Sequence, residues 1–207
     1  MALFPRAVAP FVISVLCVFA PAGAFAETPP TGGTAFEEEP PPPPMLEPGL
    51  WTGPEVAGTK AVLLTDGTAA APAEAPEQVK QAIWAANSLQ RLPYLYGGGH
   101  SLDFDVRRGA DCSGTVSFAL HAGGLLKRPL DSGSFMSWGR GGKGAWITVF
   151  TNPGHAYAKI AGLRLDTSVG AVSRTSTVAA SAFERGPRWR PSGRPPAGFV
   201  RRHPVSF

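Results

Sequence analysis

Cysteine is scarce in this sequence, with two residues in 207. Cys17 lies in an apolar N-terminal segment, and once that segment is removed Cys112 has no other cysteine to pair with. The mature chain therefore cannot be a disulfide framework. Histidine is also scarce, and one cysteine with four scattered histidines does not make a metal site. We expect no metal and no cofactor.

Long apolar runs are confined to the N-terminus, and no other stretch is long enough to cross a bilayer. Residues 1–26 combine Arg6, an apolar core and the sequence AFA at Ala24–Ala26, which is typical of a cleaved signal peptide. The alternative is an uncleaved membrane anchor. Pro10 and Pro21 favour cleavage. We therefore expect a secreted protein, without stable membrane insertion after cleavage.

An unpaired cysteine is unusual in an oxidising compartment, where cysteines pair or are absent. It indicates a reactive thiol or an intermolecular bridge. The simpler alternative is that Cys112 is a small buried apolar side chain. The net charge of +4 is modest, and export disfavours nucleic acid as a partner.

The composition of the sequence divides it into three parts, the first of which is the signal peptide at residues 1–26. Residues 27–75 are rich in proline and alanine and are predicted to be an extended spacer, with a short strand at 60–64 before an Asp-Gly turn. The compact domain is predicted at 76–207 and ends in a basic tail. This tail either meets anionic wall polymers or is a solvated, proline-broken terminus.

The compact domain is predicted to contain helices followed by strands. A helix is expected over 77–90 and a second one after Asp111, ending at Gly123-Gly124. The expected strands are 145–150, 155–161 and 163–168, and a further short helix is expected over 177–183. This order predicts an α+β fold in which N-terminal helices pack on an antiparallel β-sheet.

The predicted position of Cys112 in the first turn of a helix has a chemical consequence. Free N–H groups and a partial positive charge favour a thiolate there, and they can stabilise an oxyanion. The charge of Asp111 opposes the thiolate, so a base is still needed. His121 is nine residues further along the same helix and about half a circle around it, so it faces away from the thiol. His100 and His203 have no predicted orientation.

His155 is the histidine whose orientation can be worked out. If Ala161-Gly162 is a two-residue turn, Ile160 lies opposite Leu163, and His155 and Asp166 become diagonal neighbours on one polar face. An acid beside an imidazole fixes its tautomer, which predicts a Cys112, His155 and Asp166 triad. The alternative is that Asp166 pairs with Arg164 or caps the turn after its strand.

Four elements carry a resemblance to a known family. They are the YLYGG loop at Tyr94–Gly98, the DCSG motif at Asp111–Gly114, Gly154-His155, and Asp166. In this order they resemble the NlpC family of cell-wall cysteine peptidases, over roughly residues 76–170. The tail GPRWR…GFVRRHP resembles an actinomycete-type exported subgroup. The family more often has His, Asn or Gln where this chain has Asp166.

The resemblance implies a papain-like fold, a location in the cell wall or a periplasm-like space of a bacterium, and the stem peptides of peptidoglycan as substrate, cut between D-glutamate and the following diamino acid. It places Tyr94 beside the nucleophile, unless Tyr94 is a tyrosine at the edge of the core. It also implies that Asp111 and Ser113 recognise a free amino terminus, although Asp111 is equally an N-cap. The GGGH loop lacks the lysine of a phosphate loop and is expected to give backbone clearance.

Three other functions remain open on the sequence. The same thiol suits an amidase at the sugar–peptide link or an acyl transferase, and the same fold suits a non-catalytic wall-binding protein. We expect a monomer.

Overall fold

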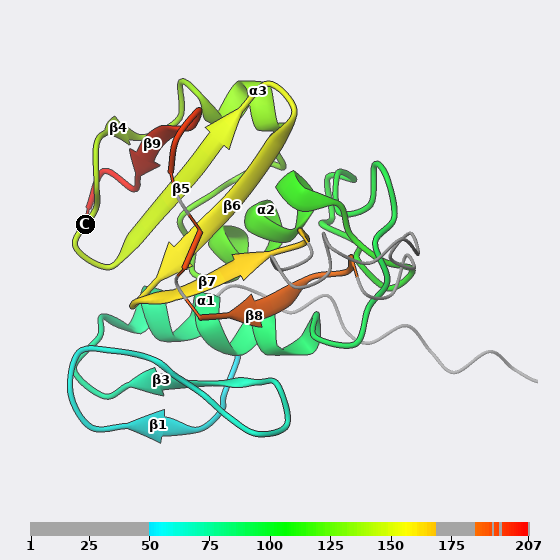
Figure 1. Ribbon diagram of the computed structural model, residues 1–207. Coiled ribbons are helices and arrows are strands. Elements are labelled where there is room, and N and C mark those ends of the chain that lie inside the picture. The colour runs from blue at the N-terminus through cyan, green and yellow to red at the C-terminus, as the bar shows by residue number, and fades with distance from the viewer. Residues whose placement is uncertain (1–49, 169–184, 192, 195, 207) are drawn as a thin grey trace, which may run out of the picture. The chain divides into compact units, whose positions relative to one another are not determined.

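The computed structural model describes residues 50–168, 185–191, 193–194 and 196–206, which fold into one compact unit (Figure 1). The predicted signal peptide, the spacer up to residue 49 and the predicted helix at 177–183 lie outside the described residues. Within the described ranges, every helix is too short or too polar to cross a membrane.

A six-stranded antiparallel sheet forms the centre of the domain, in the order β4-β9-β5-β6-β7-β8. Its strands are β4 (Arg140–Gly141), β5 (Ile147–Asn152), β6 (His155–Ile160), β7 (Leu163–Asp166), β8 (Arg188–Arg190) and β9 (Val200–His203). The helices and this sheet confirm the predicted α+β class. The three predicted central strands are present, each within two residues of its expected start.

The β6–β7 hairpin has the predicted register. Ile160 pairs with Leu163 and Ala158 pairs with Leu165, so the turn contains two residues. Ala161 and Gly162 have φ values of 46° and 94°, and two left-handed residues in succession give a turn whose twist matches that of the strands. This register brings His155 and Asp166 to the same face.

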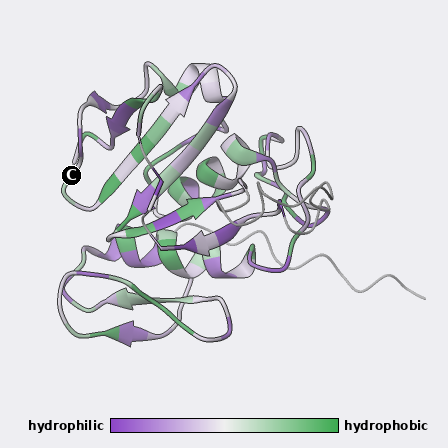
Figure 2. Cartoon of the chain, viewed as in Figure 1, coloured by the Kyte–Doolittle hydropathy of each residue, from purple (hydrophilic) through white to green (hydrophobic). Residues whose placement is uncertain are grey.

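Three helices are described, namely α1 (Glu77–Ser88), α2 (Cys112–Ala122) and α3 (Ser132–Phe135). The α2 helix begins and ends as predicted, because the side chain of Asp111 accepts a hydrogen bond from the backbone N–H of Gly114 and Gly123 is the C-cap. One side of α2 packs on β6 and β7, and the other side packs on α1. The apolar residues between these elements form the core, and β8 and β9 are mostly hydrophilic (Figure 2).

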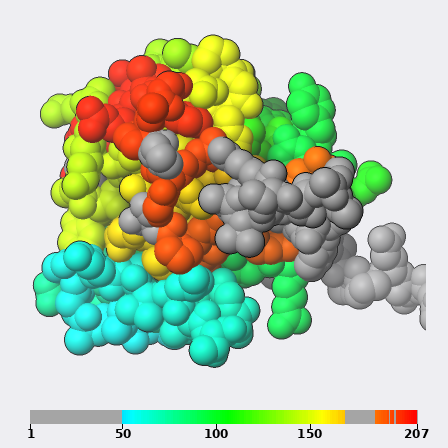
Figure 3. All heavy atoms as spheres, in the orientation of Figure 1, coloured from blue at the N-terminus to red at the C-terminus, as the bar shows by residue number. Residues whose placement is uncertain are grey.

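The predicted domain boundary at Pro76 is wrong. Residues before it form a small sheet of β1 (Glu55–Val56), β3 (Ala69–Pro72) and β2 (Val62–Leu63), in the order β1-β3-β2. All four residues of β3 are buried, although the sequence predicts an extended spacer there. In Figure 3 residues 50–75 form a continuous layer, coloured cyan, against the rest of the domain.

Two amide side chains of α1 hold this segment in place. Gln81 accepts from the backbone N–H of Trp51 at 2.7 Å and donates to its carbonyl at 2.8 Å. Asn87 makes the same pair of bonds with Ala69, at 2.8 and 2.9 Å. Since the small sheet covers the side of α1 that faces away from α2, the helix is buried over more than the single face predicted by its periodicity.

The prediction of a solvated basic tail is also wrong for the described residues, because this part of the chain supplies β8 and β9. The N–H of Trp189 donates to Oε1 of Gln90 at 2.7 Å, and its indole N–H donates to Oδ1 of Asn87 at 2.8 Å. Arg202 donates to the carbonyl oxygens of Ser137 and Gly139 at 3.0 Å. The C-terminal segment is therefore part of the fold.

Candidate active site

Cys112 is the first residue of α2, and it lies where this helix meets β6. It is a buried free cysteine. Burial raises the pKa of the Cys112 thiol, but hydrogen bonds from the His155 side chain and the Ala156 N–H lower it below its usual value. The thiolate form is thus favoured by contacts from the first two residues of β6.

His155 connects the thiol to Asp166. Its Nε2 lies 3.0 Å from Oδ1 of Asp166, as the hairpin register predicts, which leaves Nδ1 as the nitrogen for Cys112. Burial lowers the pKa of His155, but hydrogen bonds with Asp166 and Cys112 outweigh burial and raise the pKa to about 9. Both shifts favour an imidazolium beside a thiolate, and the two groups titrate as a coupled pair.

Asp166 is held as a carboxylate in a buried position. Burial raises its pKa, but hydrogen bonds from the side chains of His155 and Ser168 and from the Ser168 N–H bring the pKa well below its usual range. The N–H of Ser168 donates to Oδ1 at 2.9 Å, and its hydroxyl donates to Oδ2 at 2.7 Å. Nε of Arg164 lies 3.5 Å from Oδ2, so the predicted alternative partner is present together with His155.

The face of the hairpin that carries these residues is buried rather than open. Tyr157 is fully buried, and Arg164 and Asp166 are nearly so. The ring of Phe199 packs against Tyr157, and Arg188 and Arg190 of β8 lie opposite Asp166 and Arg164. The C-terminal segment therefore covers the face of the hairpin that the sequence predicts to be polar.

The glycine loop provides the close backbone approach that was predicted for it. A Cβ at Gly98 would lie 2.4 Å from the carbonyl oxygen of Gly109, and a Cβ at Gly114 would lie 2.0 Å from that of Gly98. The N–H of Asp111 donates to the Gly98 carbonyl at 3.2 Å. Only glycines allow the loop to lie directly against the first turn of α2, and this contact fixes the helix end that carries Cys112.

Tyr94 lies near the thiol. It bridges to Ala110, two residues before Cys112, in a parallel backbone pairing. Burial raises the pKa of the Tyr94 phenol, and the nearby charges of Cys112 and Asp111 raise it further. The hydroxyl therefore stays protonated and is able to donate a hydrogen bond.

Asp111 is fully used by local contacts. Its carboxylate accepts from the N–H groups of Gly114 at 2.7 Å and Gly97 at 3.0 Å, and from the Ser113 hydroxyl at 3.2 Å. It also lies 2.9 Å from Nε2 of His100, and this hydrogen bond is the main cause that raises the pKa of His100. These contacts support the N-cap interpretation of Asp111.

The other two histidines lie elsewhere. His121 stacks on Phe104 with ring centroids 3.9 Å apart, and its Nδ1 lies 3.0 Å from the carbonyl oxygen of Leu126. The Nδ1 atom of His203 lies 2.8 Å from the carbonyl oxygen of Pro204. His121 thus faces away from Cys112, as the helical spacing predicts.

Arg194 is the site residue that sequence reasoning missed. Its Nη1 donates to Oδ2 of Asp166 at 3.0 Å and to the Ser168 hydroxyl at 2.6 Å, and it lies 3.4 Å from Nε2 of His155. The sequence signal was one arginine among six in residues 185–207, which does not indicate a partner.

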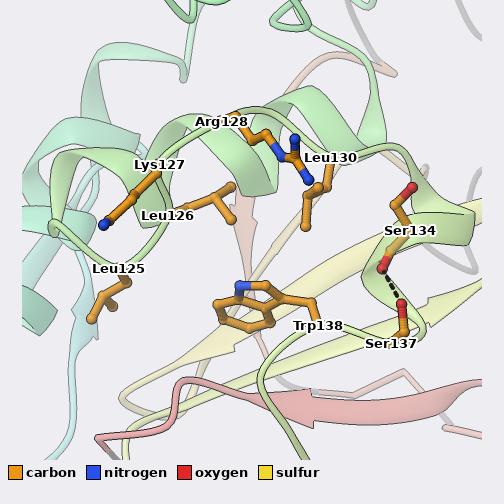
Figure 4. A pocket seen from close by; sticks show the side chains of 8 residues that line it. All are labelled: Leu125, Leu126, Lys127, Arg128, Leu130, Ser134, Ser137 and Trp138. Atoms are coloured by element: carbon orange, nitrogen blue, oxygen red, sulfur yellow. Dashed lines mark hydrogen bonds between the residues drawn. The ribbon is translucent and has the colours of Figure 1, made fainter.

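A separate pocket of about 510 Å³ lies between the loop after α2 and the loop after α3 (Figure 4). Leu126, Leu130 and Trp138 form its apolar part, and Lys127 and Arg128 carry its positive charge. Its lining does not include the Cys112, His155 and Asp166 cluster. Among the residues that the structure describes, no group of three His, Cys, Asp or Glu side chains is placed to hold a metal ion.

The sequence matches no protein-family model and no curated protein. Among solved structures, the fold is similar to the peptidoglycan hydrolase RipB from Mycobacterium tuberculosis, with 22% sequence identity and a TM-score of 0.43. The match covers 63% of this chain and 66% of the RipB chain, slightly less than two thirds of that protein.

Proposed function

We propose that this protein is an exported cysteine peptidase that hydrolyses peptidoglycan stem peptides, with Cys112 as nucleophile, His155 as acid and base, and Asp166 as orienting carboxylate. The observation that carries the proposal is the buried chain of contacts from thiol to imidazole to carboxylate. Neither a structural cysteine nor a wall-binding surface requires a thiol with a lowered pKa beside a histidine that is oriented by an acid.

In the first step, the Cys112 thiolate attacks the carbonyl carbon of the scissile amide, and a C–S bond forms. The negative oxygen that develops is stabilised by the backbone N–H of Cys112, which belongs to the first turn of α2, where N–H groups lack helical acceptors. The Tyr94 hydroxyl donates to the substrate or to the same oxygen. His155 gives its Nδ1 proton to the amide nitrogen, the C–N bond breaks, and the amine leaves.

In the second step, water hydrolyses the thioester. His155, now neutral, removes a proton from the water as the oxygen attacks the acyl carbon. The C–S bond then breaks, and a carboxylic acid product and the thiolate–imidazolium pair result. Throughout both steps Asp166 accepts from Nε2, so that Nδ1 stays directed at the sulfur.

The choice of substrate rests on the resemblance of the DCSG, YLYGG and Gly154-His155 motifs to the NlpC family. We propose the bond between D-glutamate and the following diamino acid, and action in the cell wall. A contact of Asp111 and Ser113 with a free amino terminus rests on the same resemblance, and both side chains are buried and already make local contacts, since the Ser113 hydroxyl lies 3.2 Å from Asp111 Oδ1 and from His100 Nε2. A contact of exposed tail arginines with anionic wall polymers stays part of the proposal, as does a monomeric state.

Zymography on peptidoglycan tests the hydrolase. We expect clearing by the wild-type protein and none by Cys112→Ala. Equal clearing by both would reject the thiol mechanism, and no clearing by either would favour a non-catalytic protein. His121→Gln is a matched control, because His121 lies on the same helix and contacts Phe104 instead of the thiol.

Mass spectrometry of the released fragments tests the bond. Products with a new D-glutamate carboxyl end support the endopeptidase. Fragments cut at the sugar–peptide link would assign an amidase, and fragments joined to an added amine would assign an acyl transferase.

A further inference from the structure

The two carboxylate oxygens of Asp166 contact two different basic side chains. Oδ1 lies 3.0 Å from Nε2 of His155, and Oδ2 lies 3.0 Å from Nη1 of Arg194. The Asp166 side chain is completely inaccessible to solvent, and that of Arg194 is 18% exposed. One buried negative charge is therefore shared between an imidazole and a guanidinium.

Arg194 is held in place by contacts that do not involve His155. Its Nη1 donates to the Ser168 hydroxyl at 2.6 Å. Its guanidinium lies 5.1 Å from the ring centre of Tyr157 and 5.0 Å from that of Phe199, both within the range of cation–π attraction. The positive charge thus has a fixed position next to the carboxylate.

The same guanidinium approaches the imidazole. Nη1 of Arg194 lies 3.4 Å from Nε2 of His155. When His155 is protonated, both nitrogens are donors, so they cannot bond to each other and their positive charges repel. Asp166 therefore favours the proton on His155, while Arg194 disfavours it.

We propose that Arg194 is a positioning residue that acts through Asp166: it fixes the carboxylate, takes part of its negative charge, and so lets His155 release its proton to the leaving amine. Without this cation, Arg164 at 3.5 Å would be left as the cation near Oδ2, so less of the Asp166 charge would be neutralised and the imidazolium proton would be held more tightly. The inference rests on the proposed thiol mechanism and adds a residue from the C-terminal segment to it.

Several charged groups face this pair from the surrounding elements. Cys112 faces His155 from α2, with Asp111 next to it. Asp166 is faced by Arg164 on its own strand and by Arg188 on β8, and Arg190 contributes a further charge from β8. None of these residues is altered when Arg194 is replaced, so a change in the titration of His155 in a folded variant reports the loss of the Arg194 charge.

The test follows the imidazole directly by NMR, in the full-length protein, through the pH dependence of the His155 ring carbon signal, assigned with His155→Gln. Arg194→Gln keeps a hydrogen-bond donor and removes the charge, and Arg194→Lys keeps the charge. We expect Arg194→Gln to move the His155 midpoint upward by about one pH unit, and Arg194→Lys to stay near the wild type. An unchanged or lowered midpoint in a folded Arg194→Gln protein would overturn the proposal.

Arg202→Gln is the matched control for losing a C-terminal arginine. Arg202 donates to backbone carbonyls at Ser137 and Gly139, away from the candidate site, so its loss should leave the His155 midpoint unchanged. If Arg194→Gln does not fold, Arg194→Lys decides alone: a midpoint more than half a unit above the wild type would overturn the role of the charge.

Catalysis provides a second and separable readout. On a wall substrate, the alkaline limb of the pH–rate profile should move upward with Arg194→Gln, in parallel with the NMR midpoint. If the midpoint moves as expected but the wild-type protein does not cut any wall substrate, the proposed function fails and the Arg194 inference stands. If the wild-type protein cuts and neither the limb nor the midpoint moves, the inference fails and the function stands.

Discussion

Nε2 of His155 lies 3.0 Å from Oδ1 of Asp166, although the two residues are on different strands and eleven positions apart. A two-residue turn sets this distance, because it places both side chains on one face of the β6–β7 hairpin. The acid is therefore built into the backbone register, and shifting the pairing by one residue would move it to the opposite face.

Replacing Asp166 tests whether this contact is needed for turnover. We expect Asp166→Ala to lower kcat by about 10²- to 10⁴-fold, because His155 loses the group that orients its ring. Asp166→Asn keeps the shape and an acceptor oxygen, so it should retain more activity than Asp166→Ala. Asp166→Ala also leaves Arg194 without its anionic partner, which can lower stability. Steady-state kinetics measured together with thermal melts separate a loss of turnover from a loss of stability. Unchanged turnover in Asp166→Ala would reduce Asp166 to a structural residue.

The pH dependence of activity follows from the pKa shifts of Cys112 and His155. In the proposed mechanism the reactive state is the thiolate–imidazolium pair, so activity should fall above pH 9, as His155 loses its proton with a pKa of about 9. On the acid side it should persist below the usual pKa of a thiol, because that of Cys112 is lowered.

The sign of one substitution checks the assignment of the alkaline limb. Asp166 raises the pKa of His155, so Asp166→Asn should move this limb to lower pH, opposite to the shift expected for Arg194→Gln. The measurement is kcat/KM against pH on a soluble stem-peptide substrate. If neither substitution moves the alkaline limb, the limb reports the titration of a group other than His155.

The sequence could predict those parts of the site that depend on contacts between residues close together in the chain. The helix start at Cys112 and the His155–Asp166 pair follow from local signals, namely an N-cap aspartate and a turn of two residues. Arg194 reaches Asp166 from 28 positions away, and its immediate neighbours, residues 191–196, contain three prolines and a glycine and show no periodic pattern. Such a contact depends on tertiary packing alone.

The fold shows the same division between local and distant contacts. Alternating apolar residues predicted β6 and β7, and β2 lies within the strand predicted at 60–64, but β1, β4 and β8 contain two or three residues each and are too short to show alternation. The composition of Ala69–Pro72 is that of a linker, and it forms a buried strand because Asn87 of α1 binds the backbone of Ala69. The partner residue on α1 could not be identified from the strand's own sequence.

The close approach of the glycine loop to α2 can be tested at Gly114. Its substitution by alanine would place a Cβ 2.0 Å from the carbonyl oxygen of Gly98, so the loop or the helix end must move. We expect a loss of stability of about 1–3 kcal/mol and a fall in activity, because Cys112 lies on the displaced turn. Gly141→Ala is the control, since the nearest atom to its Cβ is the flexible end of Arg202 at 3.5 Å. Denaturant unfolding with equal losses for both would contradict the steric account.

The capping role of Asp111 predicts an effect on stability. Asp111→Ala should lower the free energy of unfolding by about 1–2 kcal/mol, whereas Asp111→Asn, which is an equally good cap, should lose little. Asp131 caps the four-residue α3 at an exposed position, so Asp131→Ala should cost less. If Asp111→Asn retained stability while KM rose sharply, the amino-terminus contact implied by the family resemblance would gain support.

The position of the domain boundary can be tested by truncation. A chain that begins at Leu50 should melt close to the full-length protein, because it keeps the small sheet. A chain that begins at Pro76 loses the contacts of Trp51 and Ala69 with α1 and uncovers Trp84, a loss on the order of 2 kcal/mol or more. Equal melting temperatures for the two chains would restore the boundary predicted from composition.

The place of β8 and Arg194 in the chain has a consequence for the newly made protein. During synthesis Cys112 and His155 emerge well before Trp189, which pairs with Gln90 across 99 positions. Since the strand that covers the hairpin face and the cation that contacts Asp166 both come late, an incomplete chain has a thiol and an imidazole but lacks the surroundings that fix them. The order of synthesis therefore delays assembly of the candidate site until nearly the whole polypeptide is available, and we expect truncated products to lack the proposed activity.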